Sequence, residues 1–253
     1  MEVPIRSARL LYLVFCIQTL FAQEREIAFE HISREQGLSQ SEVQCIIRDS
    51  KGFLWIGTQG GLNRYDGYTF TVYKNNVVDS NSLHDNYVQA IYEDHNGMLW
   101  IGTRGALHRF DRARGKFTRF LHDPANPRTI SSNIISSVCE DHTGTLWVGT
   151  DNGLNRFDSE KQEFIRYFHN SADLASLSSD GVTAMYADHS GTLWIGTTNG
   201  LDYFDSQRGK FVHFRKDVNN PQSLTSNSVT SIYEDRGGTL WIGTADGLNR
   251  LDG

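Results

Sequence analysis

The sequence predicts an all-β fold, a β-propeller of four-stranded blades, and two observations carry this prediction. The first is a long repeat with a period near 47 residues, marked by the five tryptophans of the 253-residue chain. A fixed period in this range indicates a propeller or a solenoid. The second is that every copy consists of short alternating segments separated by turns, without helical periodicity. The tryptophans are Trp55, Trp100, Trp147, Trp194 and Trp241.

Composition agrees with a domain of this size and excludes several other classes of protein. Hydrophobic residues make up 38% of the chain and aromatic residues 11%, which is too much apolar material for a disordered protein. Three cysteines cannot staple a small fold, and their spacing does not suit a zinc site. The 24 Lys and Arg residues against 30 Asp and Glu give a net charge of -6, so we expect no binding to nucleic acid through bulk charge.

Residues 1–22 are predicted to be a secretory signal peptide rather than part of the fold. Arg6 and Arg9 precede an apolar run from Leu10 to Phe21, and Ala22 supplies a small residue at the cleavage point. The run is shorter than the ~20 apolar residues that a membrane helix needs, although an uncleaved anchor stays an alternative. We therefore expect an exported chain, periplasmic or extracellular, with a propeller over residues 23–253.

Each copy of the repeat predicts four strands in a fixed order. The first strand, from about Val43 to Arg48 in the first copy, has a small residue at a fixed place, which suits the crowded inner edge of a blade. The segment Asp-x-x-Gly then forms a tight turn, because Asp bonds its own backbone and Gly supplies positive φ. Leu-Trp-Ile-Gly-Thr is the second strand, and a segment close to Leu-Asn-Arg-Phe-Asp is the third. The fourth strands are expected at 70–73, 117–120, 164–168 and 211–214.

The two ends of the repeat array leave two interpretations open. The last copy reaches Gly253 after its third strand, whereas the apolar alternation of residues 27–32 predicts a fourth strand without the preceding three. Either this N-terminal strand completes a five-bladed ring, or the five blades are part of a larger propeller. The second interpretation is favoured, because the sequence stops within a motif.

The consensus Asp-x-x-Gly-x-Leu-Trp-Ile-Gly-Thr-x-x-Gly-Leu-Asn-Arg-Phe-Asp closely resembles the two-component-regulator propeller repeat, over residues 23–253. This resemblance implies the periplasmic sensor region of a hybrid histidine kinase or related receptor, whose propellers are commonly seven-bladed. It implies an environmental ligand, with carbohydrate suggested by family association alone. Further propeller blades, downstream receptor domains and a receptor dimer are the other partners that it implies.

The long connections between blades are the expected site of ligand binding. They span about residues 74–86, 121–134, 169–181 and 215–228, and they vary far more than the strands do. One small polar residue stands eight positions before each motif aspartate, and we predict that this set meets a hydroxyl-rich ligand. The alternative is that each of these side chains caps its own loop. The candidate ligand-binding residues are Ser41, Asn86, Asn133, Asp180 and Asn227.

Other repeated residues are better explained by structure than by chemistry. The tryptophans lie mid-strand between apolar residues, so they are predicted to pack between blades rather than to bind sugars. The turn histidines His95, His142 and His189 belong to different blades, so they are expected to decorate turns rather than to bind a metal. The arginines Arg64, Arg109, Arg156 and Arg250 precede strand-ending aspartates, which favours ion pairing or turn formation over anion binding.

No set of residues suits catalysis, so the sequence predicts no catalytic residue, no cofactor and no metal site. The predicted function is a non-enzymatic, ligand-sensing input domain. The alternatives are a stand-alone exported five-bladed binding or scaffold protein and, less favoured, a propeller lyase.

Overall fold

The computed structural model describes residues 28–251, so the predicted signal peptide lies outside the described residues. The chain divides into two units, Met1–His31 and Ile32–Gly253, and the second unit carries the fold. It begins with a short 3₁₀ helix, Arg34–Gln36, which Ser33 caps. No helix within residues 28–251 has the length and apolarity needed to cross a membrane.

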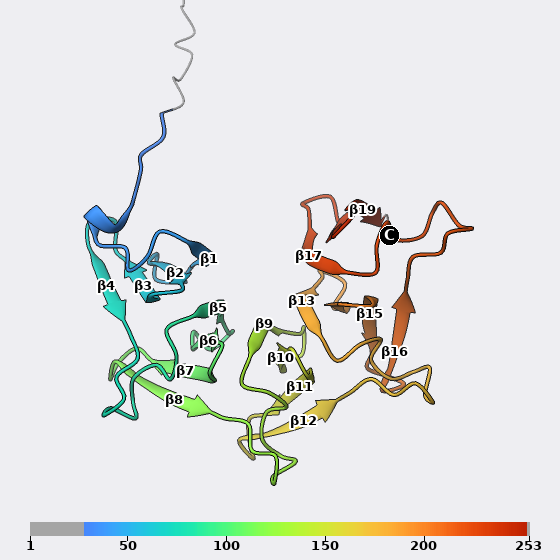
Figure 1. Ribbon diagram of the computed structural model, residues 1–253, viewed down its shortest axis with the longest axis horizontal. Helices are drawn as coiled ribbons and strands as arrows, with labels where there is room; N and C mark the ends of the chain where they lie inside the picture. Colours follow the sequence, from blue (N-terminus) through green and yellow to red (C-terminus); the bar gives the residue numbers. More distant parts are fainter. Residues whose placement is uncertain (1–27, 252–253) are drawn as a thin grey trace, which may run out of the picture. The chain divides into compact units, whose positions relative to one another are not determined.

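The second unit is an all-β propeller of five blades, each an antiparallel sheet whose strands pair in chain order (Figure 1). Blade 1 consists of β1 (Val43–Arg48), β2 (Leu54–Thr58), β3 (Gly61–Tyr65) and β4 (Phe70–Tyr73). Blade 2 consists of β5 (Val88–Glu93), β6 (Leu99–Thr103), β7 (Leu107–Asp111) and β8 (Lys116–Phe120). Blade 3 consists of β9 (Ile135–Glu140), β10 (Leu146–Thr150), β11 (Gly153–Asp158) and β12 (Glu163–Tyr167). Blade 4 consists of β13 (Val182–Ala187), β14 (Leu193–Thr197), β15 (Gly200–Asp205) and β16 (Lys210–Phe214), and blade 5 of β17 (Val229–Glu234), β18 (Leu240–Thr244) and β19 (Gly247–Leu251).

Successive blades are joined through their first strands, which lie on the inner side in Figure 1. β1 packs against β5, β5 against β9, β9 against β13 and β13 against β17. The glycines in the second strands of blades 1 to 4 make this approach possible. A Cβ atom on Gly149 would lie 2.5 Å from Val182 Cγ1 in the next blade, well inside van der Waals contact. The prediction of a crowded inner edge is therefore confirmed.

The motif aspartate and the motif tryptophan form one unit in all five blades. In blade 3, Asp141 Oδ1 accepts hydrogen bonds from the backbone N–H of Thr143 and Thr145, which closes the turn. Its second oxygen accepts the indole N–H of Trp147 at 2.8 Å. The indole is 1% exposed and lies 5.1 Å from the ring of Phe204 in the next blade. The prediction that the tryptophans pack between blades is confirmed for Trp55, Trp100, Trp147 and Trp194, whereas Trp241 in blade 5 is half-buried and no further blade follows it within residues 28–251.

The strand predicted for residues 27–32 is not present in the described part of that segment. Residues 28–32 lie outside every strand, and Phe29 is 84% exposed. A strand needs a neighbouring edge to satisfy its backbone N–H and C=O groups, and no strand pairs with this segment within residues 28–251. Alternation alone therefore predicted one strand too many.

The turn histidines do more than decorate turns, which the sequence did not reveal. His95 Nδ1 lies 2.6 Å from Glu140 Oε1 in the next blade, and the backbone N–H of His95 donates to the other carboxylate oxygen. His189 and Glu234 make the same two contacts. Ser50 and Glu93 make the equivalent pair between blades 1 and 2. We call these three pairs the interblade clasps.

The strand-ending aspartates form turns, as predicted, but not through the arginine column. Asp111 accepts two backbone N–H groups of its turn and pairs with Arg114, three residues later. Asp158 with Lys161 and Asp205 with Arg208 repeat this arrangement. The guanidinium of Arg64 instead lies over the ring of Phe53 and donates to the Thr71 hydroxyl at 3.3 Å, so it stacks and hydrogen-bonds within blade 1.

Candidate functional site

The candidate ligand-binding residues lie where the connecting loops join the first strands, and four of them close their own loop. Each carbonyl or carboxylate oxygen accepts the backbone N–H of the residue that begins the loop, at 2.6–2.7 Å. The four pairs are Asn86 with Asn75, Asn133 with His122, Asp180 with His169, and Asn227 with Lys216. Ser41 is exposed just before β1. Loop capping is thus one role of these side chains, and ligand binding by them stays a prediction.

A polar side chain in the third strand of each blade accepts a backbone N–H of the loop, and it is buried in blades 1 to 4. In blade 3, Asn155 Oδ1 accepts the backbone N–H of Ser131, and its Nδ2 donates to the carbonyl of Val148. The equivalent residues of the five blades are Asn63, His108, Asn155, Asp202 and Asn249. In the sequence this position is asparagine in three of the five copies. The exceptions are His108 and Asp202, and the hydrogen bonding differs at these two residues.

His108 fills this position in blade 2 as a neutral imidazole. Its Nε2 accepts the backbone N–H of His84 at 2.9 Å, and its Nδ1 faces the carbonyl of Ile101 at 3.3 Å. One nitrogen therefore accepts and the other donates, as the asparagine amide does elsewhere. Burial lowers the pKa of His108 to about 3, because the charged form would lose its hydration.

Asp202 fills the position in blade 4 and brings an ionic partner with it. One oxygen accepts the backbone N–H of Ser178 at 2.8 Å, and the other lies 2.8 Å from His213 Nδ1. His213 Nε2 lies 2.9 Å from the carbonyl of Leu174, which only accepts. Both ring nitrogens thus face acceptors, so the geometry favours the imidazolium. The hydrogen bond and negative charge of Asp202 raise the pKa of His213.

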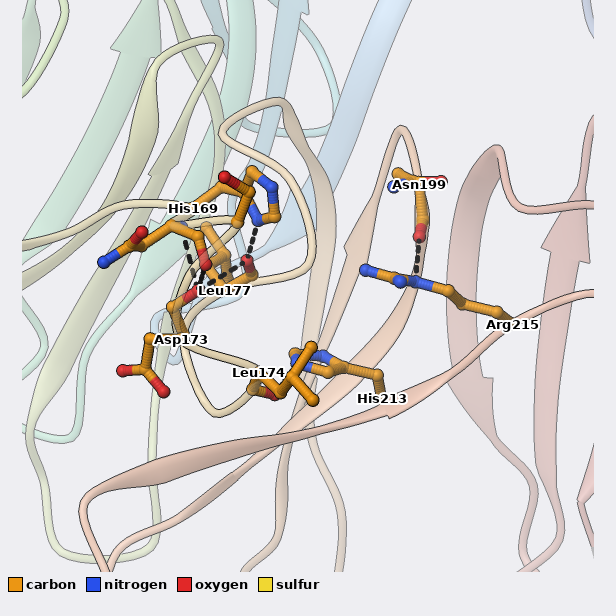
Figure 2. A pocket seen from close by; sticks show the side chains of 10 residues that line it. His169, Asp173, Leu174, Leu177, Asn199, His213 and Arg215 are labelled. Carbon is orange, nitrogen blue, oxygen red and sulfur yellow. Dashed lines mark hydrogen bonds between the residues drawn. The ribbon is translucent and has the colours of Figure 1, made fainter.

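A cavity of about 260 Å³ opens above this pair, between the loop that precedes blade 4 and the strand β16 (Figure 2). Figure 2 shows His169, Asp173 and Leu177 on one side and Asn199 with Arg215 on the other. Arg215 Nε donates to the carbonyl of Asn199 at 3.2 Å. The cavity therefore combines the variable loop, the exceptional Asp202–His213 pair and a second cation. Sequence analysis missed it, since His213 and Asp202 stand 11 residues apart on neighbouring strands.

Comparison with known proteins gives the repeat its family. The sequence profile of the two component regulator propeller matches residues 37–60, 82–105, 129–152, 176–199 and 223–246. The curated relative Histidine kinase P4 of Formosa agariphila is 45% identical over 69 residues, which are 27% of this chain and 5% of that protein. The chain thus spans a small part of the relative that it matches.

Solved structures share the fold at low identity. The extracellular domain of a hybrid two component system from Bacteroides thetaiotaomicron superposes with a TM-score of 0.57 at 23% identity, over 88% of this chain and 41% of that one. Virginiamycin B lyase from Staphylococcus aureus superposes with a TM-score of 0.60 at 16% identity, over 83% and 67% of the two chains. At these identities the two structures show the propeller fold alone. All five Trp motifs fall within the matched segments, and the chain belongs to the family of two-component regulator propeller repeats.

Proposed function

We propose that this chain is the extracytoplasmic, ligand-sensing input region of a two-component signal-transduction receptor. The observation that supports this function most directly is the family itself, since a segment of each of the five blades matches the two component regulator propeller. The match to a histidine kinase over 69 residues supports the same role. A secretory signal peptide over residues 1–22, followed by a propeller over 23–253, would deliver the blades outside the cytoplasm.

The division of labour within each repeat supports a binding role. The strands repeat nearly the same side chains in the same contacts, whereas the loops carry different side chains on an unchanged frame. Binding a ligand at this face would favour one arrangement of the receptor over another and so shift its signalling equilibrium. We propose an environmental ligand, carbohydrate by family association, with further blades, downstream receptor domains and a receptor dimer as protein partners.

An in-frame deletion of residues 37–251 in the native gene tests this function. We expect the cell to lose its transcriptional response to one class of environmental solute, while any remaining part of the gene product is still made. An unchanged response to a broad panel of sugars, amino acids and other small molecules would contradict the proposal. Turnover of any of these solutes by the purified chain would favour the lyase alternative instead.

A further inference from the structure

The loops before blades 2 and 3 both hold an arginine head group from the fourth strand of the blade that follows. In blade 2, Arg119 on β8 reaches back over the loop that precedes the blade. Its Nε donates to the carbonyl of Ser82 at 3.0 Å, and its Nη2 donates to the carbonyls of Asp79 at 2.8 Å and Leu83 at 3.2 Å. The same Nη2 lies 3.1 Å from Ser82 Oγ. The loop thus forms a cradle of carbonyl and hydroxyl oxygens around one guanidinium group.

Blade 3 repeats the arrangement with a different loop sequence. Arg166 on β12 donates from Nε to the carbonyl of Thr129 at 2.5 Å and from Nη2 to the carbonyl of Asn126 at 2.8 Å. The Thr129 hydroxyl lies 2.7 Å from the same Nη2. Because two unlike loops hold a guanidinium in the same way, the cradle is a property of the loop backbone rather than of one side chain.

The loop before blade 4 has the same internal bonds but holds no guanidinium in its cradle. The backbone N–H of Ser176 donates to the carbonyl of Asp173 at 3.0 Å, as Thr129 does to Asn126 in blade 3. The Ser176 hydroxyl bonds the carbonyl of Asn170, the counterpart of the bond that Thr129 makes to Asp123. These contacts place the backbone of the blade 4 loop in register with the two occupied cradles.

His213 stands on β16 where the other two blades have arginine, and it is too short to reach this cradle. Its Nε2 bonds the carbonyl of Leu174 instead. The cavity of about 260 Å³ is lined by Asp173, Ser176 and Leu177, which correspond to the three cradle residues of blade 2. The cavity therefore occupies the place that an arginine head group fills in the neighbouring blades.

The polar groups of the cavity favour a ligand that donates hydrogen bonds. Both nitrogens of His213 are engaged, and Arg215 uses Nε on the carbonyl of Asn199 and Nη2 on the carbonyl of Ser178. The charge of His213 is offset by Asp202, with which it forms an ion pair. Asp173 lies on the side of the cavity opposite Arg215 (Figure 2), and its carboxylate accepts the backbone N–H of Ala175 at 3.0 Å. What the cradle offers is chiefly carbonyl oxygen, which binds planar N–H donors well.

We propose that the cavity between the loop 169–177 and β16 is a binding site for a guanidinium cation. The cation belongs either to a free small molecule or to an arginine side chain of a polypeptide, since both present the same planar set of donors. The inference deepens the proposed sensing function, because it names a ligand class for one loop, and its signalling consequence rests on that function. Binding itself is a separate property of the purified chain.

Titration of the full chain with methylguanidinium, followed by NMR and calorimetry, tests the site. We expect saturable binding of one equivalent, with shifts confined to the amides of residues 169–177 and to the ring of His213. Methylammonium, which lacks the planar fork, and acetate, an anion, are expected to bind at least tenfold more weakly. Agmatine and an arginine-containing tripeptide then separate the two sources, because the source that fits binds more tightly than methylguanidinium.

Two variants serve as matched controls. His213→Arg supplies the guanidinium from the chain itself, as blades 2 and 3 do, and is expected to fold and to lose binding. Arg166→Ala opens the cradle of blade 3 and is expected to raise the stoichiometry from one to two. Preferential binding of acetate, or unchanged methylguanidinium binding in His213→Arg, would overturn the site. The two proposals fail separately. If the purified chain binds methylguanidinium but the deletion of residues 37–251 leaves the transcriptional response unchanged, the sensing function is contradicted and the site is not. If the deletion abolishes the response but the purified chain does not bind methylguanidinium, the site is contradicted and the sensing function is not.

Discussion

A single position can carry three chemistries without changing the fold around it, as the buried polar residue of the third strand shows. At this position Asn155, His108 and Asp202 each accept a backbone N–H of the loop. They differ in the second hydrogen bond that each side chain makes. The amide donates to a carbonyl, the imidazole does so while neutral, and the carboxylate recruits a histidine. The imidazole solution depends on pH, because burial lowers the pKa of His108.

Replacing His108 by Asn, the residue at this position in three other blades, is expected to remove a source of acid sensitivity. The folded pKa of His108 is about 3. The unfolded chain therefore binds a proton near pH 6.5 that the folded chain refuses, so stability falls as pH decreases from about 6.5 towards about 3. The difference amounts to about 1.4 kcal/mol per pH unit. Urea unfolding of both proteins between pH 4.5 and 8 measures it, with the exposed His142→Asn of blade 3 as control. Equal pH profiles for the wild type and His108→Asn would contradict the assignment.

At the scale of the element, the interblade clasps join a turn of one blade to the first strand of the next. Each clasp uses a residue just after the motif aspartate and a glutamate that ends the following first strand. The interface between blades 3 and 4 lacks one, since Ala187 stands at the end of β13 where the others have glutamate. His142 nevertheless lies over Gly191, as His95 lies over Gly144 at the preceding interface.

Ala187→Glu is expected to install the missing clasp with His142. The gain is about 0.5–1 kcal/mol, because the pair is partly exposed and part of its attraction is lost to solvent. Urea unfolding at pH 6 measures the change. The double variant Ala187→Glu/His142→Ala is the control, and it is expected to lose part of the gain. A gain of equal size in the double variant would show that His142 takes no part.

Elements of this chain were easier to predict than the contacts between them. The strand order and the turn at Asp141 followed from local spacing, because a strand alternates and a tight turn needs Asp and Gly at fixed places. The pairing of His95 with Glu140 links residues one repeat apart, where a single sequence gives no signal. To predict the cavity at His213, one would have to know the path of the loop 169–177 and how far the His213 side chain reaches, and a single sequence gives neither. The strand predicted for residues 27–32 was wrong over the described residues 28–32, because an alternation of apolar and polar residues does not supply a partner strand.

The whole molecule is a series of nearest-neighbour interfaces, and its stability is expected to follow that series. Each blade packs on the next through its first strand, and each interface requires a glycine in the second strand of the preceding blade. In such an array the stability approximates a sum of blade terms and interface terms. A change at one interface should therefore weaken the blades beside it more than the distant ones.

Gly149→Ala tests this expectation at the interface between blades 3 and 4. The new Cβ would lie 2.5 Å from Val182 Cγ1, so we expect a loss of about 1–3 kcal/mol through overpacking. Hydrogen exchange should rise in β9–β16 more than in β1–β4. The exposed turn variant Gly237→Ala is the control, since other blades carry side chains at that position. Partial recovery in Gly149→Ala/Val182→Ala would assign the loss to this contact, and uniform exchange throughout the chain would contradict the series.

The arginine that crosses the loops before blades 2 and 3 has a consequence for the proposed site in blade 4. Arg119 and Arg166 fill the same cradle of carbonyl oxygens in two blades, and the loop before blade 4 keeps the internal bonds of that cradle with His213 in place of the arginine. In this repeat the proposed pocket arises where histidine, a shorter side chain, stands at the position that arginine has in blades 2 and 3. The proposed site therefore differs from the two filled cradles by one side chain on β16, while the core of the blade keeps the same repeated residues.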